Sequence, residues 1–252
     1  MKIPIIKEEK DYLIINKPAG LIVHGGPHIH EKTLVDYLLE KYPDLRKIGE
    51  DPFRPAIVHR LDKDASGLMV IPKNNEFFHY LKKQFKERKI KKEYSALVYG
   101  VIEKDYGTID FPIKRSSQGH KMAAIPKKNK NIDKKENVSN RQQGNIDSQE
   151  KSREALTNFL VVRRYSNFTL LNVDIKTGRT HQIRVHFSAY GYPLWGDNLY
   201  ANKKSKVKNK KMNTERLFLT ATCLGFFSPE KVWQEFEIDP GPDLKKILSD
   251  LK

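Results

Sequence analysis

One polar segment of the 252-residue sequence lies between two short apolar runs and constrains the fold most. Residues 56–58 and 68–71 are apolar and largely β-branched, whereas residues 59–67 are mostly ionisable or hydroxylated. This pattern predicts two strands joined by a tight loop that contains glycine. Functional side chains are often carried on loops held by rigid strands, so the loop is a candidate site. A structural alternative stays open, in which Asp62 or Asp64 only bonds the backbone of its own turn.

Apolar periodicity predicts the other elements of the fold. Helices are expected at 33–42, at 74–89 with Asn74 as the N-cap, through Ile183, Phe187 and Tyr190, and at 244–251. Strands are expected at 11–16, 21–23, 93–100, 155–164, 168–175, 217–222 and 232–238. Because strands outnumber helices and do not alternate with them regularly, the expected fold class is α+β.

The charge balance points to a polyanionic partner. Lys and Arg outnumber Asp and Glu, which gives a formal net charge of +16. Nucleic acid is the leading candidate partner and an anionic membrane surface the weaker one, although a lysine-rich proteome also produces such a surplus. The sequence contains no apolar run of transmembrane length, no secretory leader and a single cysteine, Cys223. We therefore expect a soluble, cytoplasmic protein without disulfides or a cysteine zinc site.

Three segments are unusually polar. Residues 82–92 carry seven positive charges against one negative, which fits either a solvated helix face or a surface for RNA phosphates. Residues 127–154 contain almost nothing apolar and predict a mobile surface insertion. Residues 202–216 predict a second polar insertion. Both insertions are expected to interrupt one domain, residues 1–252, rather than to divide two.

A second polar run, residues 177–186, follows a predicted strand and leads into a helix. It places Arg179, His181, Gln182 and Arg184 near a helix N-terminus, which favours anions. The alternative is a capped amphipathic helix whose arginines extend along the surface. Three histidines in the segment 24–30 suggest a metal site, but no carboxylate cluster accompanies them, so no metal is expected.

Four motifs in order resemble the RluA-type pseudouridine synthases. They are residues 59–67 (His-Arg-Leu-Asp-Lys-Asp-Ala-Ser-Gly), residues 16–24, residues 92–98 and residues 177–200. The resemblance implies a single catalytic domain with a mixed, mostly antiparallel β-sheet, flanking helices and a central RNA-binding cleft. It also implies conversion of uridine to pseudouridine in structured RNA, with ribosomal RNA expected first and tRNA as the other candidate. No separate N-terminal RNA-binding domain is expected.

The resemblance assigns roles to individual residues. Asp62 matches the catalytic aspartate, Tyr94 the tyrosine that stacks on the target base and supports acid–base chemistry, and Arg184 the arginine paired with that aspartate. Arg60 matches a residue that helps to displace the base. The remaining candidates for base displacement or RNA binding are His59, Lys17, Arg179, His181 and Gln182.

The implied reaction breaks the C1′–nitrogen bond of uridine, rotates the uracil and joins its carbon 5 to C1′. The ionised carboxylate can attack C1′ or remove the C2′ proton, and both routes stay open. An adjacent guanidinium favours the ionised carboxylate, and an aromatic ring receives the extruded base. The reaction involves no redox change or group donor, so no cofactor is expected.

Two positions depart from the family pattern: Ala65 replaces the usual threonine, and Thr220 replaces the usual histidine. One alternative function is a catalytically silent RNA-binding or ribosome-assembly protein with the same fold. Another is an Asp-dependent metal nuclease, but only Asp62 and Asp64 lie close together in the sequence. The expected partner is RNA, without a membrane or an obligate protein partner, and the chain is expected to be a monomer.

Overall fold

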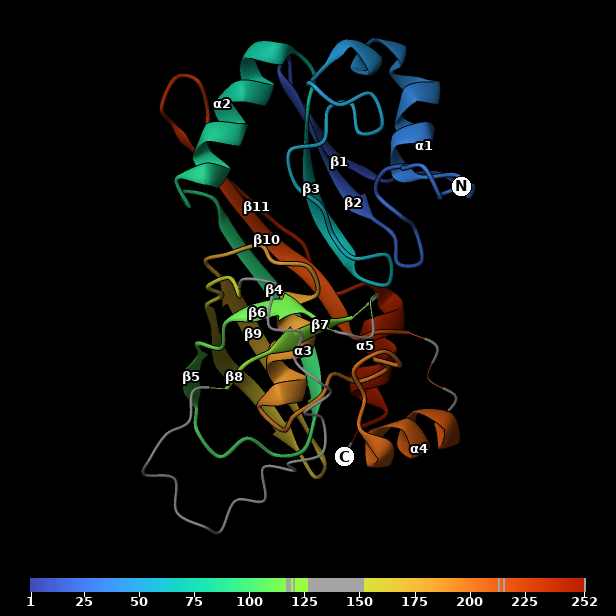
Figure 1. Cartoon of the computed structure of the whole chain (residues 1–252), viewed down its shortest axis with the longest axis vertical. Helices are drawn as coiled ribbons and strands as arrows, with labels where there is room; N and C mark the ends of the chain where they lie inside the picture. Colours follow the sequence, from blue (N-terminus) through green and yellow to red (C-terminus); the bar gives the residue numbers. More distant parts are fainter. Residues whose placement is uncertain (117–118, 120, 127–151, 213, 215, 252) are drawn as a thin grey trace. The chain divides into compact units, whose positions relative to one another are not determined.

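The computed structural model describes residues 1–116, 119, 121–126, 152–212, 214 and 216–251 (Figure 1). The chain divides into two compact units. The first unit contains Met1–Ser95 and Leu219–Leu251, and the second contains Ala96–Phe218. The expectation of one catalytic domain stays a prediction.

The first unit is built on a mixed sheet in the strand order β1-β2-β3-β10, and β11 also pairs with β10. Only the β3–β10 pairing among these is parallel. The strands are β1 (Ile5–Glu8), β2 (Tyr12–Lys17), β3 (Ser66–Pro72), β10 (Leu219–Phe227) and β11 (Trp233–Glu237). The helices are α1 (Leu34–Lys41), the 3₁₀ helix η1 (Pro43–Lys47), α2 (Asn75–Lys86) and α5 (Pro242–Ser249).

Helix α2 covers this sheet with an apolar face. Phe77 and Leu81 pack with Ile90 and with side chains from β2, β3 and β10, which are Tyr12, Ile14, Leu68, Val70, Leu224 and Phe226. Burying one such side chain contributes about 1.5–3 kcal/mol. The predicted N-cap is confirmed, because Asn74 Oδ1 accepts the Phe77 backbone N–H at 2.8 Å. This packing fixes β3, which begins at the end of the polar 59–67 loop.

The second unit contains an antiparallel β-hairpin formed by β8 (Thr157–Tyr165) and β9 (Phe168–Ile175). Strand β4 (Lys91–Tyr99) passes from the first unit into the second, where the strand order is β4-β9-β8-β5. The remaining strands are β5 (Tyr106–Ile109), β6 (Ile113–Arg115) and β7 (Met122–Ala124). Helices α3 (Gln182–Ala189) and α4 (Lys203–Lys211) complete this unit. The predicted α+β class with a mostly antiparallel sheet is confirmed.

Two predicted strands are absent from the described structure. Residues 56–58 are not in a strand, and Ala56 lies in a turn with φ 57°, although Ala56 and Ile57 are still buried. The apolar pattern of these residues therefore reflects their burial and does not indicate an extended backbone. Residues 21–23 are not paired in a sheet either. Instead the carbonyls of Ile22 and Val23 accept the N–H groups of Leu34 and Val35, which satisfies the first donors of α1.

The two predicted insertions have different outcomes. Residues 202–216 contain helix α4, where only an irregular excursion was expected. Most of the 127–154 segment lies outside the described residues. Among the helices that are described, none combines the length and the apolar character needed to cross a bilayer.

Candidate active site

The 59–67 loop ends in a tight turn against strand β10. The Ala65 N–H donates to the Asp62 carbonyl at 3.2 Å, which closes a turn over Lys63 and Asp64. Gly67 has φ +118°, and a Cβ atom there would lie 2.3 Å from the Ala221 carbonyl oxygen. Only glycine permits this close approach of β3 to β10. Asp62 therefore begins a turn whose far end is held by a sheet.

A buried lysine holds the other side of this loop. Lys17 is 0% exposed, and its Nζ donates to the carbonyls of Pro18 and Leu21, each at 2.8 Å, and of Lys63 at 3.1 Å. The Gly20 N–H donates to the same Lys63 carbonyl at 2.8 Å. These bonds satisfy the buried ammonium and join the 17–21 turn to the Asp62 turn. They give Lys17, predicted as an RNA contact, a structural role.

His59 is also held by internal contacts. Its Nε2 accepts the Val70 N–H at 3.0 Å, and its ring stacks on Phe85 at 4.9 Å between centroids. Burial, followed by the positive charge of Lys92, lowers the pKa of His59 from 6.5 to about 3. The imidazole is therefore neutral near pH 7, and its nitrogen serves as a fixed acceptor that anchors the start of the loop to β3.

The phenol of Tyr94 is buried and is influenced by the charge of Asp62. Tyr94 lies in β4 and is 7% exposed. Burial, and then the negative charge of Asp62, raise the pKa of the Tyr94 phenol well above its usual value, so the phenol is protonated at neutral pH. The charge of Asp62 therefore acts on the buried phenol. Arg60, two residues before Asp62, is exposed.

The two departures from the family pattern occupy buried positions beside the loop. Ala65 is 2% exposed, and Thr220 pairs with Ser66 across the parallel strands β10 and β3. Both therefore border the segment that carries Asp62. The structure gives neither residue a contact that performs chemistry.

The polar run before α3 is organised by Gln182. Its Oε1 accepts from the Thr177 hydroxyl at 2.7 Å and the Arg179 N–H at 3.1 Å, and its Nε2 donates to the Leu156 carbonyl at 2.9 Å. The Arg179 Nε donates to the Glu154 carbonyl at 3.0 Å. Gln182 is buried, so these contacts assign it to the local structure and not to an exposed RNA surface.

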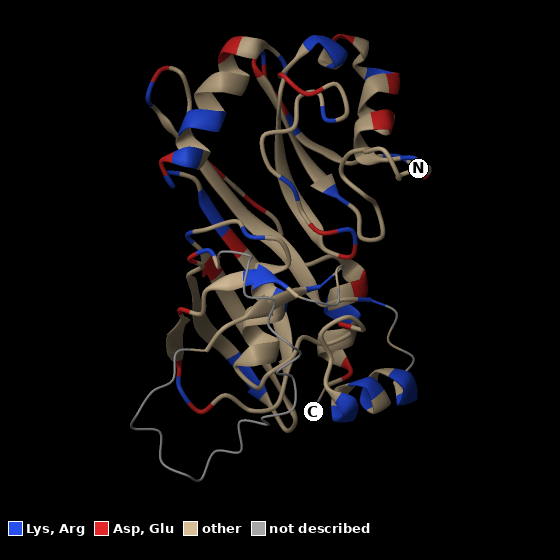
Figure 2. Ribbon diagram, viewed as in Figure 1, with Lys and Arg blue, Asp and Glu red and all other residues tan. Residues whose placement is uncertain are grey.

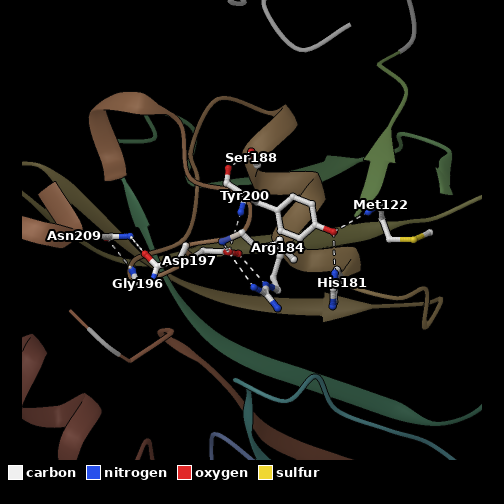
Figure 3. Close-up of polar contacts among 10 residues, drawn as sticks. Met122, His181, Arg184, Ser188, Gly196, Asp197, Tyr200 and Asn209 are labelled. Atoms are coloured by element: carbon white, nitrogen blue, oxygen red, sulfur yellow. Dashed lines mark hydrogen bonds and ion pairs between the residues drawn. The ribbon is translucent and has the colours of Figure 1, made fainter. Parts of the chain in front are cut away.

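Arg184 forms a buried ion pair that the sequence analysis did not anticipate. Its Nε lies 2.8 Å from Oδ2 of Asp197, and its second terminal nitrogen lies 2.9 Å from Oδ1 (Figure 3). The side chains of Arg184 and Asp197 are 4% and 0% exposed. Oδ1 of Asp197 also accepts the N–H groups of Leu199 and Tyr200, which fixes the carboxylate.

Tyr200 connects this ion pair to His181. The Arg184 guanidinium lies 5.5 Å from the centre of the Tyr200 ring, and the Tyr200 hydroxyl lies 2.8 Å from Nδ1 of His181 (Figure 3). The same hydroxyl accepts the Met122 N–H at 2.9 Å. The predicted residues His181 and Arg184 therefore meet through Tyr200, which sequence reasoning missed. The sequence identifies the 196–200 segment as part of a motif. It does not show that Asp197 pairs with Arg184 or that Tyr200 bonds to His181.

Among the described residues, one group has metal-ligand spacing: Cys223, Glu235 and Glu237 on β10 and β11. Burial raises the pKa of the Cys223 thiol to about 12, so the thiol is protonated. The Lys91 ammonium pairs with Glu235 at 2.6 Å. A protonated thiol and a carboxylate neutralised by lysine are poor metal ligands.

The arrangement in the first unit can support catalysis by a carboxylate. Asp62 stands at a turn restrained by Lys17 and by Gly67, and its charge acts on the neutral phenol of Tyr94. An ionised carboxylate can act as a nucleophile or as a base, and a tyrosine ring can stack on an extruded base. The predicted pairing of Asp62 with Arg184 joins residues of different units and stays a prediction.

Comparisons with known proteins identify the family. A sequence profile described as RNA pseudouridylate synthase matches residues 11–189. The chain is 42% identical over 252 residues to an RNA pseudouridine synthase of Aquifex aeolicus, and the alignment covers 98% of this chain and 72% of that protein. It is 37% identical over 204 residues to ribosomal large subunit pseudouridine synthase D of Pseudomonas aeruginosa, covering 81% of this chain and 55% of that protein.

A solved structure supports the same fold. Human RNA pseudouridylate synthase domain containing 4 matches with a TM-score of 0.73 at 24% identity, covering 99% of this chain and 94% of that one. The profile match extends from β2 through α3 and therefore includes both Asp62 and Arg184. The chain belongs to the RNA pseudouridylate synthase family.

Proposed function

We propose that this chain converts specific uridines of large-subunit ribosomal RNA to pseudouridine, with Asp62 as the catalytic carboxylate. The observation that carries the proposal is the turn that holds Asp62, which is closed by the Ala65 N–H and restrained by Lys17 and Gly67. The charge of Asp62 also acts on the buried, neutral phenol of Tyr94. Relatives named as ribosomal large subunit pseudouridine synthases C and D support ribosomal RNA as the substrate. An arrangement of this kind favours catalysis over RNA binding alone.

In the proposed reaction, Asp62 attacks C1′ or removes the C2′ proton, and the bond between C1′ and N1 of uracil breaks. The released uracil rotates against the ring of Tyr94. Its carbon 5 then bonds to C1′ while the bond between Asp62 and C1′ breaks or, in the other route, while Asp62 returns the proton to C2′. Carbon 5 loses its proton to water and N1 gains one, so the product is an isomer of the substrate. Arg184 is proposed to orient Asp62, and Arg60 to displace the target base from its stack.

The family match supports RNA as the partner. Action as a monomer, without a protein partner and in the cytoplasm, stays a prediction. So does the assignment of ribosomal RNA over tRNA.

The substrate can be identified by mapping pseudouridine in ribosomal RNA and tRNA from cells with and without this gene. We expect one or more sites in large-subunit ribosomal RNA to lose pseudouridine in the deletion strain. A plasmid encoding the wild-type chain should restore these sites, and one encoding Asp62→Asn should not. Loss confined to tRNA would contradict the ribosomal assignment, and an unchanged map in both RNAs would contradict the proposed function.

A further inference from the structure

Helix α4 is a strongly basic element without acidic partners. Six of its nine residues are lysines, and they colour the helix almost entirely blue in Figure 2. In the described part of the chain, no carboxylate forms an ion pair with any of these lysines. Among the described residues, these charges are therefore not neutralised by carboxylates.

The lysines form two rows. Lys204, Lys208 and Lys211 follow one flank of the helix at i, i+4 and i+7. The other flank carries Lys203, Lys206 and Lys210 at i, i+3 and i+7. Each row is about 10 Å long, from the helical rise of 1.5 Å per residue. Neighbours in a row repel one another because like charges three or four residues apart face each other.

The helix lacks the apolar face that normally holds a surface helix in place. Its buried positions are Ser205 and Asn209, both polar, and Val207 on the opposite side is exposed. Lysines in the first turn are also unfavourable, because that end of the helix carries partial positive charge. A helix that is polar all round, with repulsive pairs, needs another source of stability.

Asn209 supplies the attachment of α4 to the second unit. Its Oδ1 accepts from the Gly196 N–H at 3.3 Å (Figure 3). The same oxygen accepts from the Tyr99 hydroxyl, and Nδ2 donates to Oδ1 of Asn198 at 3.3 Å. These bonds hold α4 against the turn that contains Asp197, the partner of Arg184. The lysine rows thus face solvent on a helix that is fixed to the turn carrying Asp197, and Asp197 in turn restrains Arg184.

We propose that α4 is a docking surface for the phosphate backbone of the RNA substrate. Two rows of ammonium groups that form no ion pair with a described carboxylate complement a polyanion, although Lys208 also lies over the Tyr99 ring at 5.7 Å. Binding of a polyanion relieves the repulsion within each row. An anionic membrane fits less well, because helices that lie on membranes bury an apolar face and α4 has none. This inference rests on the proposed function, since it assigns the same RNA a second point of contact.

The test compares Lys203→Gln/Lys206→Gln/Lys210→Gln with Lys2→Gln/Lys10→Gln/Lys104→Gln. The two variants lose the same charge, and the control lysines are exposed and lie on other segments. Affinity for a large-subunit ribosomal RNA transcript and for poly(U) is measured from 50 to about 300 mM salt, a range in which phosphate contacts change affinity strongly. The α4 variant should bind roughly tenfold more weakly, and its salt slope should fall by about 2, at about 0.7 per lost contact.

Three results overturn the proposal: a salt slope equal to that of the wild type, equal losses in the control variant, or tighter binding to phosphatidylserine vesicles or polyglutamate than to RNA. Hydrogen exchange gives a second readout that does not depend on mutation. Backbone amides of Lys203–Lys211 should gain protection when poly(U) is added to the wild type, and unchanged exchange contradicts docking at α4.

Isomerisation of the same transcript, measured in parallel, separates this proposal from the proposed function. The α4 variant should need more RNA than the wild type to reach half of its maximal rate. A wild type that binds RNA through α4 without forming pseudouridine contradicts the proposed function alone. A wild type that forms pseudouridine while α4 is dispensable for binding contradicts the docking surface alone.

Discussion

Arg184 and Asp197 form a two-point ion pair, with nitrogen–oxygen distances of 2.8 and 2.9 Å, in a position almost closed to solvent. Asp197 therefore sets the plane of the guanidinium as well as neutralising it. A lysine cannot reproduce two parallel bonds, because its ammonium is a single point of charge. Within the proposed reaction, Asp197 is a positioning residue for Arg184.

Breaking this ion pair should destabilise the fold. Removal of one partner leaves a buried charge without its counter-charge, so Asp197→Asn should lower the free energy of unfolding by about 3–5 kcal/mol. Urea unfolding of Asp197→Asn, Arg184→Met and the double variant checks this. The double variant should be less destabilised than the sum of the two single variants, and simple additivity would contradict direct pairing.

The loop that carries Asp62 should depend on Lys17. Lys17→Met removes three bonds to carbonyls, of which the one to Leu21 is fully buried, at a cost of about 2–5 kcal/mol in unfolding free energy. Lys63→Gln is the control, since its ammonium forms only an exposed ion pair with Glu31. Thermal or urea unfolding measures both variants. Equal, small effects would remove Lys17 from its structural role.

His59 should make stability fall in mild acid. The unfolded imidazole takes up a proton near pH 6.5, whereas the folded one stays neutral to about pH 3. Between these values the unfolded state binds more protons, so the free energy of unfolding decreases as the pH falls. His59→Gln retains an acceptor for the Val70 N–H but does not titrate. Its stability should therefore decline less than that of the wild type between pH 6.5 and 4, as urea unfolding at each pH would measure. Parallel curves would contradict the assignment.

The elements that were predictable from sequence depend on local signals. Thr33 and Asp36 begin α1 through reciprocal bonds between side chain and backbone, and Asn74 caps α2. Residues 56–58 were less predictable, because burial of Ile57 and a turn at Ala56 leave the same apolar pattern as a strand.

The candidate site was only partly predictable for a related reason. A resemblance can single out Arg184, but the thirteen-residue separation between it and Asp197 carries no periodic signal. Likewise, a lysine beside a proline gives no sign that its ammonium will be buried, as that of Lys17 is. Such contacts become evident only when distant segments are placed together by the fold.

Tyr94 should act through its ring more than through its hydroxyl. The phenol is protonated at neutral pH, and the proposed role of the ring is to stack on the flipped uracil. Tyr94→Phe keeps that ring and should retain measurable isomerisation, whereas Tyr94→Leu should lose it by a factor of about 10 or more, from a stacking energy of about 1–3 kcal/mol per base. Single-turnover rates at saturating RNA measure both. Equal loss in the two variants would assign the essential role to the hydroxyl.

Release of tritium from RNA labelled at carbon 5 of uracil tests most directly whether Asp62 performs the isomerisation. Because carbon 5 exchanges its hydrogen for the bond to C1′, each pseudouridine formed transfers one label to water. Wild type should release tritium from a large-subunit ribosomal RNA transcript, and Asp62→Asn should release none while it still binds that RNA. Asp64→Asn, which changes an exposed carboxylate in the same turn, should retain activity. Near-normal release by Asp62→Asn would contradict the account.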